Sequence, residues 1–375
     1  MEHRGGMVRR PGRLIGMMAG ALGVVLAVTA CSAGGGTSGT PAASFASASA
    51  QPSAGTHEFT DDAGRHVRIP NTITKIAPSG AEAQAVLFTL CPDKIVGLGS
   101  KLSSDQLPYL SPQFAALPVF GSFYSGTLNM EAVMKAAPQI VIDIGEVKPD
   151  NTSDLDSIQQ RTGIPTIFVQ MGNATYAQAY AKLGEVTGDS TQASKIVSYI
   201  NQTLGGIQAK VATIPASQRP NVYYGENDGL TAVGAGTEHA QDLDFVGATN
   251  VAKLSGSEST ATISMEQLML WNPDVILLAP GTAYAAVATS SQWQGLAAVK
   301  AGKYAEIPSG LYSWMDQPPS ANQILGIVWL ANLLYPNAFD FDMVSQAQTF
   351  YSLFYHYTLS DAQAKVLLAN AAFKG

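Results

Sequence analysis

Two glutamates, Glu131 and Glu266, occupy the third position of two closely similar phrases. The phrases are NMEAVMKAAPQIVI, which begins at Asn129, and SMEQLMLWNPDVIL, which begins at Ser264. Both first residues are good N-caps, so each phrase predicts a short amphipathic helix with a carboxylate in its first turn, where the helix dipole favours negative charge. In each phrase a proline then ends the helix, and an apolar run predicts a buried parallel strand. The phrases begin 135 residues apart. Solenoid repeats are only about 20 to 50 residues long, so two similar α/β lobes are favoured.

Aromatic side chains are concentrated in glycine-rich loops that follow the predicted strands. In open α/β sheets a ligand lies beyond the carboxyl ends of the strands, so these loops are expected to face a cleft. Rings there could pack on a planar or bulky chelate, and tyrosine hydroxyls could hydrogen-bond to its oxygens or, as phenolates, ligate iron. Burial inside the lobes is the alternative for several rings. The candidate ligand-binding residues are Ser79, Phe123, Tyr124, Tyr224, His239, Tyr284, Tyr312 and Trp314.

His239, in the segment GAGTEH, is the histidine best placed to meet a metal or an acidic group. A capping or surface role is the alternative. Proteins that bind bare zinc or manganese need several clustered histidine and carboxylate ligands, and the sequence offers no such cluster. We therefore expect no direct metal site.

The first 56 residues differ in composition from the rest of the chain. Residues 1–30 combine an arginine-containing start, an uncharged apolar stretch at 14–28 and small residues before Cys31, which indicates a secretory signal peptide. The apolar stretch is short for a membrane span, which needs about 20 residues, although an uncleaved anchor helix is the alternative. A signal that ends directly at a cysteine resembles that of a bacterial lipoprotein, and the resemblance implies a lipid attached to Cys31. Residues 31–56 carry no charge and predict a flexible tether.

Charge and missing motifs exclude several functions. The chain after residue 30 carries 17 Lys and Arg against 27 Asp and Glu, a net charge near −10, which opposes nucleic-acid binding. It has one other cysteine, Cys91, so no intramolecular disulfide is expected. No phosphate-binding loop, nucleophile elbow or complete dinucleotide fingerprint is found, so we expect neither an enzyme nor a cofactor.

Strands and helices alternate over most of the chain, which predicts an α/β fold with parallel sheets. Residues 57–174 form the expected N-terminal lobe. Residues 175–215 contain a helical pattern without a strand, and predict a long linking helix with a break near TGD. Residues 216–375 form the expected C-terminal lobe, which ends in helices that pack back on the body.

The order of these segments, from TDDAGRHVRIP through both glutamate-bearing phrases to WLANLLYP, resembles the substrate-binding lipoproteins of ABC importers, and among them those for ferric siderophores, haem and cobalamin. The resemblance covers about residues 58–372. It implies two α/β lobes joined by one long helix, with the ligand in the cleft between them. It also implies that Glu131 and Glu266 each dock on an arginine of a permease dimer that works with an ATPase. The expected protein is a monomer, anchored by lipid on the extracytoplasmic face of the cell membrane.

The resemblance leaves the ligand open. Relatives that bind highly anionic triscatecholates use convergent basic residues, whereas arginine is scarce in this chain. An iron-siderophore-type chelate of lower charge, such as a hydroxamate, is therefore expected. Haem and cobalamin are alternatives, and so is molybdate or tungstate, since glycine-rich turns and helix N-termini bind oxyanions through backbone N–H groups. A surface lipoprotein that binds another macromolecule is the rival outside this class.

Overall fold

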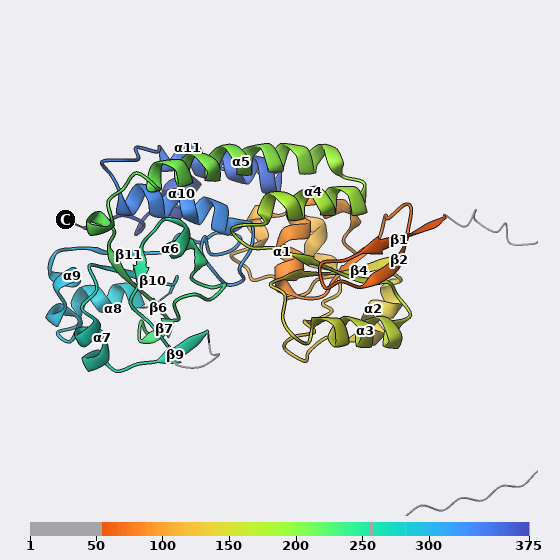
Figure 1. The fold of residues 1–375 in the computed structure, drawn as a ribbon, viewed down its shortest axis with the longest axis horizontal. Coiled ribbons are helices and arrows are strands. Elements are labelled where there is room, and N and C mark those ends of the chain that lie inside the picture. Colours follow the sequence, from red (N-terminus) through yellow and green to blue (C-terminus); the bar gives the residue numbers. More distant parts are fainter. Residues whose placement is uncertain (1–54, 255–258, 282, 375) are drawn as a thin grey trace, which may run out of the picture. The chain divides into compact units, whose positions relative to one another are not determined.

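The computed structural model describes residues 55–254, 259–281 and 283–374, which belong to one compact unit (Figure 1). The predicted signal peptide, the lipid site at Cys31 and nearly all of the tether lie outside the described residues. Within the described ranges, no helix is both long and apolar enough to cross a membrane.

The N-terminal lobe is built on a short parallel sheet in the order β3-β4-β5. An antiparallel hairpin of β1 and β2 precedes it. The strands are β1 (Thr56–Thr60), β2 (His66–Pro70), β3 (Ile76–Pro78), β4 (Ile140–Gly145) and β5 (Thr166–Gln170). The helices are α1 (Ala81–Leu90), α2 (Met130–Ala136) and α3 (Asn151–Thr162). Four of the six residues of β4 are isoleucine or valine, and all four are buried, as expected for a central parallel strand.

The C-terminal lobe contains a larger sheet in the order β11-β10-β6-β7-β9, with β8 paired to β6. β6, β8, β10 and β11 pair in parallel, as predicted, and β7 runs antiparallel to both β6 and β9. The strands are β6 (Asn221–Glu226), β7 (Thr231–Val233), β8 (Thr249–Asn250), β9 (Thr260–Thr262), β10 (Val275–Leu278) and β11 (Tyr304–Glu306). The helices are α6 (Gln241–Phe245), α7 (Met265–Trp271), α8 (Ala283–Thr289) and α9 (Ala297–Lys300).

Two helices, and not one, lie between the lobes. α4 (Tyr176–Thr187) ends at Gly188, whose φ of 79° is favourable for glycine, and α5 (Ser190–Val211) then packs along α4. The 22 residues of α5 span about 33 Å at 1.5 Å per residue. The break was expected near TGD, but the sequence did not show that the chain reverses there.

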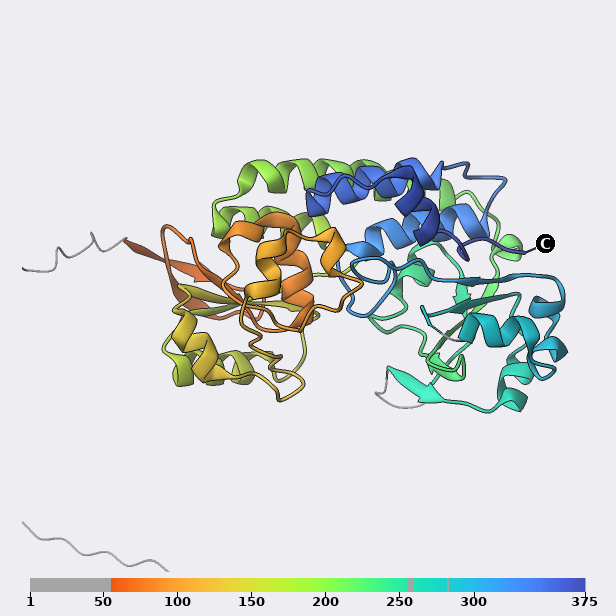
Figure 2. The ribbon, with the colours of Figure 1, turned by 180° about the vertical axis from the view of Figure 1, so that it is seen from behind.

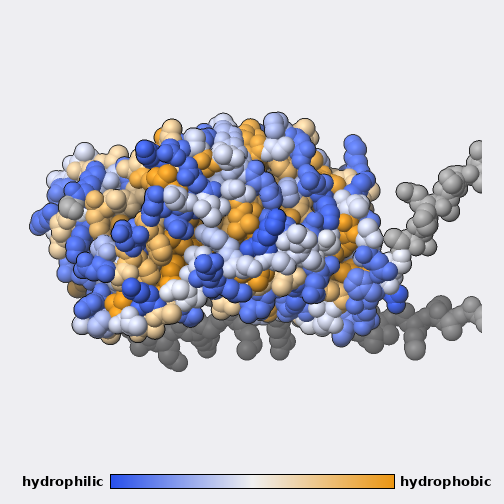
Figure 3. Space-filling view, turned by 90° about the horizontal axis from the view of Figure 1, so that it is seen from above, coloured by the Kyte–Doolittle hydropathy of each residue, from blue (hydrophilic) through white to orange (hydrophobic). Residues whose placement is uncertain are grey.

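The C-terminal helices brace the linking helix. They are α10 (Asn322–Leu334), α11 (Met343–Tyr355) and α12 (Asp361–Leu367). α10 and α11 both contact α5, and α11 also contacts α1 of the first lobe. Figure 2 shows α10 and α11 beside α5 along one side of the body. Seen from that side, hydrophilic and apolar residues are intermixed over the surface (Figure 3).

The largest hydrophobic core is continuous across the body. It includes side chains from β4, α5, β6 and α10, and therefore joins both lobes through the linking helices. Each lobe also has one smaller core of its own in its outer part. Because bending at α5 would disturb close-packed side chains, we expect the lobes to tilt only slightly when a ligand binds.

Candidate ligand-binding cleft

Asp143 is the centre of a hydrogen-bond network at the carboxyl end of β4. Its side chain is almost fully buried, in a strand that is otherwise apolar. The Ser79 hydroxyl donates to Asp143 Oδ1, and the Tyr124 hydroxyl donates to Oδ2 at 2.7 Å. Asn151 Nδ2 in turn donates to the Tyr124 hydroxyl at 2.9 Å. Burial raises the pKa of Asp143, and the hydrogen bonds from Ser79 and Tyr124 oppose this rise.

The same network acts on Tyr124. Burial, and then the nearby charge of Asp143, raise the pKa of the Tyr124 hydroxyl. The hydroxyl therefore stays protonated, which favours hydrogen bonding over iron ligation as a phenolate, the two roles considered for the loop tyrosines. Its ring remains 47% exposed, and the Lys148 ammonium lies 5.1 Å from the ring centroid. The ring can therefore contact a ligand while its hydroxyl is held by Asp143.

Glu82 lies beside this network, in the first turn of α1. Burial, and then the charge of Glu238, raise the pKa of Glu82 to about 8. A Cβ at Gly145 would lie 2.8 Å from Glu82 Oε2, and Gly145 has a φ of 154°, so glycine is required for this close approach. A cavity of about 120 Å³ opens here. Its wall includes Ser79, Gly80, Glu82, Ser122, Tyr124, Asp143, Glu146, Lys148 and Pro318.

The facing wall comes from the C-terminal lobe and is also acidic. His239 Nδ1 lies 2.8 Å from Asp316 Oδ1, and His239 Nε2 lies 3.7 Å from Glu238 Oε1. Burial alone would lower the pKa of His239, but the hydrogen bond and charge of Asp316 outweigh it and raise the pKa. Nearby, Gln317 Nε2 donates to Glu226 Oε1 at 2.7 Å, and burial raises the pKa of Glu226.

The two walls meet at a floor shared by both lobes. The floor includes Tyr176, Glu238, Gln241 and Gln323. Gln323 Nε2 donates to the Glu238 carbonyl at 3.0 Å, and the Tyr176 hydroxyl donates to Gln323 Oε1 at 2.6 Å. The cleft between the lobes is thus lined by polar groups that are already held in place.

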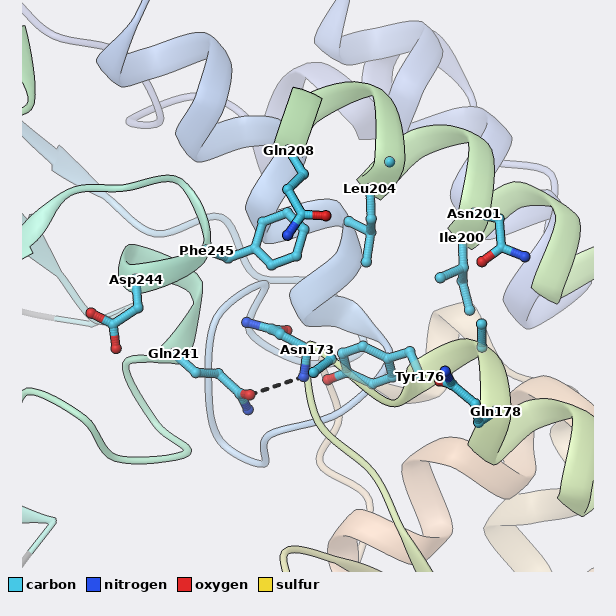
Figure 4. Close-up of a pocket in the computed structure, with 13 residues that line it drawn as sticks. Asn173, Tyr176, Gln178, Ile200, Asn201, Leu204, Gln208, Gln241, Asp244 and Phe245 are labelled. Carbon is cyan, nitrogen blue, oxygen red and sulfur yellow. Dashed lines mark hydrogen bonds between the residues drawn. The ribbon is translucent and has the colours of Figure 1, made fainter. Parts of the chain in front are cut away.

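A second hollow lies behind this floor, between α4, α5 and α6 (Figure 4). Tyr176 and Gln241 belong to both sites. The Asn173 backbone N–H donates to Gln241 Oε1 at 2.9 Å, and Asn173 Nδ2 donates to Asp242 Oδ1 at 2.9 Å. Asn173 therefore joins the end of the first lobe to the start of α6 in the second.

The structure brings together only some of the predicted ligand-binding residues. Ser79 and Tyr124 line the cavity, and His239 lies on the facing wall. Phe123 is half-buried and packs edge-on against Tyr124, with ring centroids 5.8 Å apart. The other four aromatic predictions need correction, because each ring is buried in a lobe: Tyr224, Tyr284, Tyr312 and Trp314.

Each of these four rings has a packing role. Tyr224 lies within β6, and Trp314 is fully buried in the main core. Tyr284 of α8 packs on Tyr304 of β11, in the outer core of the second lobe. Tyr312 accepts a hydrogen bond from Gln84 Nε2 at 3.0 Å. Burial of a large aromatic ring is strongly favourable. A ring in a loop can therefore fold into the core of its lobe, and the position of these residues in loops was not enough to predict that they face the cleft.

Sequence reasoning missed most of the charged groups of the cleft. They are Glu82, Asp143, Glu146, Lys148, Glu226, Glu238 and Asp316. Asp143 gave a usable signal, since it is the charged residue in the apolar strand IVIDIG. In the described part of the chain, no group of three or more His, Cys, Asp and Glu side chains has an arrangement suited to hold a metal ion.

The two repeated glutamates lie outside the cleft in matching environments. Asn129 Oδ1 accepts the Ala132 N–H at 3.0 Å, and Ser264 Oγ accepts the Gln267 N–H at 3.2 Å, so both helices are capped as predicted. Glu131 and Glu266 are both exposed. Hydrogen bonding to its own backbone and to Ser264 lowers the pKa of Glu266. Figure 1 shows α2 and α7 on the side of the body opposite α5.

Comparison with known proteins identifies several similar chains. The family model described as periplasmic binding protein matches residues 91–311. The molybdate-binding protein MolA of Haemophilus influenzae is 25% identical over 323 residues, which cover 79% of this chain and 90% of that protein.

Solved structures agree with this match. An ABC transporter solute binding protein from Sulfurospirillum deleyianum has a TM-score of 0.78 and 26% identity, over 83% of this chain and 99% of that chain. A periplasmic solute binding protein from Veillonella parvula has a TM-score of 0.70 and 24% identity, over 84% of this chain and 98% of its own.

Proposed function

The chain belongs to the periplasmic binding protein family, and we propose that it captures a neutral or positively charged metal chelate of the iron-siderophore type. Proteins of this family are extracytoplasmic, non-enzymatic components of ABC transporters. They bind a small ligand and pass it to a permease that works with an ATPase. The expectation of an α/β transport protein without catalytic activity is therefore confirmed, whereas the identity of the ligand rests on the chemistry of the cleft.

The charge balance of the cleft carries this proposal. Glu146, Glu226, Glu238 and Asp316 add negative charge around the cavity, against the cations Lys148 and His239. Two like unit charges 5 Å apart repel each other by about 3 kcal/mol at an effective dielectric constant of about 20. A dianion would therefore meet a net repulsion, and a chelate with an ammonium group would be attracted.

The remaining features of the cleft suit an organic chelate. The exposed face of the Tyr124 ring offers an apolar surface for its carbon framework. The carboxylates accept hydrogen bonds, and a chelate that bears amide N–H or ammonium groups would supply the donors. A ferric trihydroxamate with a free ammonium group combines all of these properties.

Molybdate is the second candidate, and two observations favour it. A relative that carries the name molybdate-binding protein is 25% identical over most of this chain. In addition, α1 begins at Gly80 without a side-chain cap, and the cavity reaches that end of the helix, where backbone N–H groups favour an anion. Glu82 opposes an oxyanion in this first turn only when it is ionised.

Calorimetric titration of the mature protein would separate these candidates. The ligands are an ammonium-bearing ferric trihydroxamate, haem, cobalamin, molybdate and tungstate. We expect binding of the trihydroxamate, weakened by about 1 to 3 kcal/mol in Tyr124→Ala and unchanged in Tyr357→Ala, a half-buried tyrosine of the C-terminal tail. Tight binding of molybdate without binding of any chelate would replace the first proposal by the second.

The attachment to the membrane and the contact with the permease are further parts of the proposal. We place a lipid on Cys31 after removal of residues 1–30, and we assign docking on the permease to Glu131 and Glu266. Intact-mass measurement of protein extracted from host membranes tests the first point. A mature chain that begins at Cys31 and carries a diacylglycerol mass is expected, and a chain that keeps residues 1–30 would exclude it.

A further inference from the structure

The helices that carry the repeated glutamates also expose large apolar side chains. Met134 on α2 is 45% exposed, Met269 on α7 is 42% exposed, and Leu270 on α7 is 78% exposed. On the inner side of the same helices, Val133 and Leu268 are buried and attach α2 and α7 to their lobes. Leu270, the most exposed of the three, therefore contributes least to holding α7 in place.

Their positions match those of the glutamates. Met134 follows Glu131 by three residues, and Met269 follows Glu266 by three. Residues three or four apart are neighbours on a helix surface, so each glutamate has an exposed methionine beside it. Each helix thus presents a carboxylate next to a flexible, polarizable apolar side chain.

The next position breaks the symmetry between the lobes. Leu270 follows Glu266 by four residues, whereas the equivalent residue after Glu131 is Lys135, which is also exposed. The face on α7 therefore consists of Glu266, Met269 and Leu270, and the face on α2 of Glu131, Met134 and Lys135. One is acidic and apolar, and the other carries a cation beside its carboxylate.

We infer that these are two non-identical docking faces for the permease, with Leu270 as an apolar anchor that the α2 face lacks. This rests on the proposed docking of Glu131 and Glu266. The fitting partner surface presents a cation flanked by apolar side chains, because it must pair with Glu266 and cover Met269 and Leu270. A partner cation is repelled by Lys135 on the other face, so the lobe that carries α7 makes the stronger contact.

Photo-crosslinking in the native host tests the contact without knowledge of the ligand. A photoreactive amino acid is placed in the full-length lipoprotein at position 134, 269 or 270, and at position 366 as a control. Val366 on α12 is 73% exposed and lies on a different helix. We expect crosslinks to a permease subunit, identified by mass spectrometry, from the first three positions and not from position 366. Crosslinks from all four positions alike, or from none, would overturn the inference.

Substitutions then test the asymmetry. We expect Leu270→Lys to reduce the amount of permease that co-purifies with the protein by about tenfold, which corresponds to about 1.4 kcal/mol. Lys135→Leu should leave it unchanged or increase it, and Val366→Lys should leave it unchanged. Equal recovery with Leu270→Lys and wild type would refute an apolar anchor.

A parallel measurement keeps the two proposals distinguishable. If Glu131→Lys and Glu266→Lys abolish co-purification while Leu270→Lys does not, only the asymmetric anchor fails. If none of the three variants loses the permease, the proposed docking itself fails. Leu270 is largely exposed, so the melting temperature of Leu270→Lys should match that of the wild type and exclude misfolding as the cause.

Discussion

Lys148 and Glu238 face each other across the cleft, with Lys148 Nζ 3.5 Å from Glu238 Oε1. The first residue belongs to the N-terminal lobe and the second to the C-terminal lobe. The lysine side chain is 48% exposed, and such ion pairs contribute about 0 to 1 kcal/mol to stability. A weak pair that joins the lobes can be replaced by ligand contacts at little cost.

Replacement of Lys148 should therefore affect binding more than folding. In Lys148→Gln we expect the free energy of unfolding to fall by less than about 1 kcal/mol. Affinity for an ammonium-bearing ferric trihydroxamate should rise several-fold, because the cleft loses a positive charge. Calorimetry and chemical denaturation measure the two quantities, with Lys195→Gln on the exposed side of α5 as the control. Weaker binding in Lys148→Gln would indicate an anionic ligand.

The raised pKa of Glu82 predicts a pH dependence of binding. With a pKa of about 8, Glu82 is mostly neutral at pH 6 to 7 and must lose its proton to attract a cationic chelate. Affinity for that chelate should increase by up to about tenfold per pH unit towards pH 8 and level off above it. In Glu82→Gln this dependence should become weaker, and the part that remains should come from His239, whose pKa is raised by Asp316. Calorimetry from pH 6 to 9 measures the affinity of the wild type and of Glu82→Gln. If the ligand that binds loses affinity as the pH rises towards 8 and above, an anion such as molybdate is indicated, because an ionised Glu82 repels it.

Glu82 should also make stability depend on pH. Its pKa is raised in the folded protein, so the unfolded chain ionises first. Its stabilising contribution is complete below the unfolded value of 4.5 and is lost as pH rises to about 8. The melting temperature of Glu82→Gln minus that of the wild type should therefore be larger at pH 8 than at pH 4.5. An equal difference at both pH values would contradict the raised pKa.

Local features of the sequence predicted local structure well. Asn129 and Ser264 were expected as N-caps, and both accept the predicted hydrogen bonds, because a capping residue and its helix are adjacent in sequence. The cleft depends on contacts that no local pattern encodes. Glu82 lies in α1, Asp143 in β4 and Glu238 in the segment before α6, so they are far apart in sequence. Burial in the folded protein raises the pKa of Glu82 and of Asp143. Burial of Trp314 likewise depends on helices later in the chain.

The joint between the lobes is expected to depend on Asn173. Asn173→Ala removes the hydrogen bond to Asp242, a fully buried carboxyl group whose Oδ2 already lacks a partner among the described residues. Leaving a buried polar group unsatisfied costs about 1 to 3 kcal/mol, so we expect a decrease of that size in the free energy of unfolding. Asn201→Ala, at an exposed amide of the same hollow, should change it by less than about 0.5 kcal/mol. Equal effects in a urea titration would contradict a role for this hydrogen bond.

Reversal of the repeated glutamates tests why the phrase occurs twice. If Glu131 and Glu266 pair with permease cations, Glu131→Lys and Glu266→Lys should each strongly reduce uptake of a ⁵⁵Fe-labelled ferric trihydroxamate by host cells. Affinity of the purified variants for the chelate should be unchanged, because both side chains lie outside the cleft. If the carboxylates serve only the helix dipole, the melting temperature should fall slightly and uptake should fall only with the amount of folded protein.

Uptake, melting temperature and affinity are therefore measured on the same two variants and on Glu185→Lys, an exposed position of α4. Glu185 lies near the C-terminal end of its helix, where a cation is favoured, so this control changes the charge without disturbing either effect. Reduced uptake in the two docking variants alone would support contact with the permease. Normal uptake in the double variant would leave the glutamates with a role in helix stability only, and the contact with the permease would have to involve other residues.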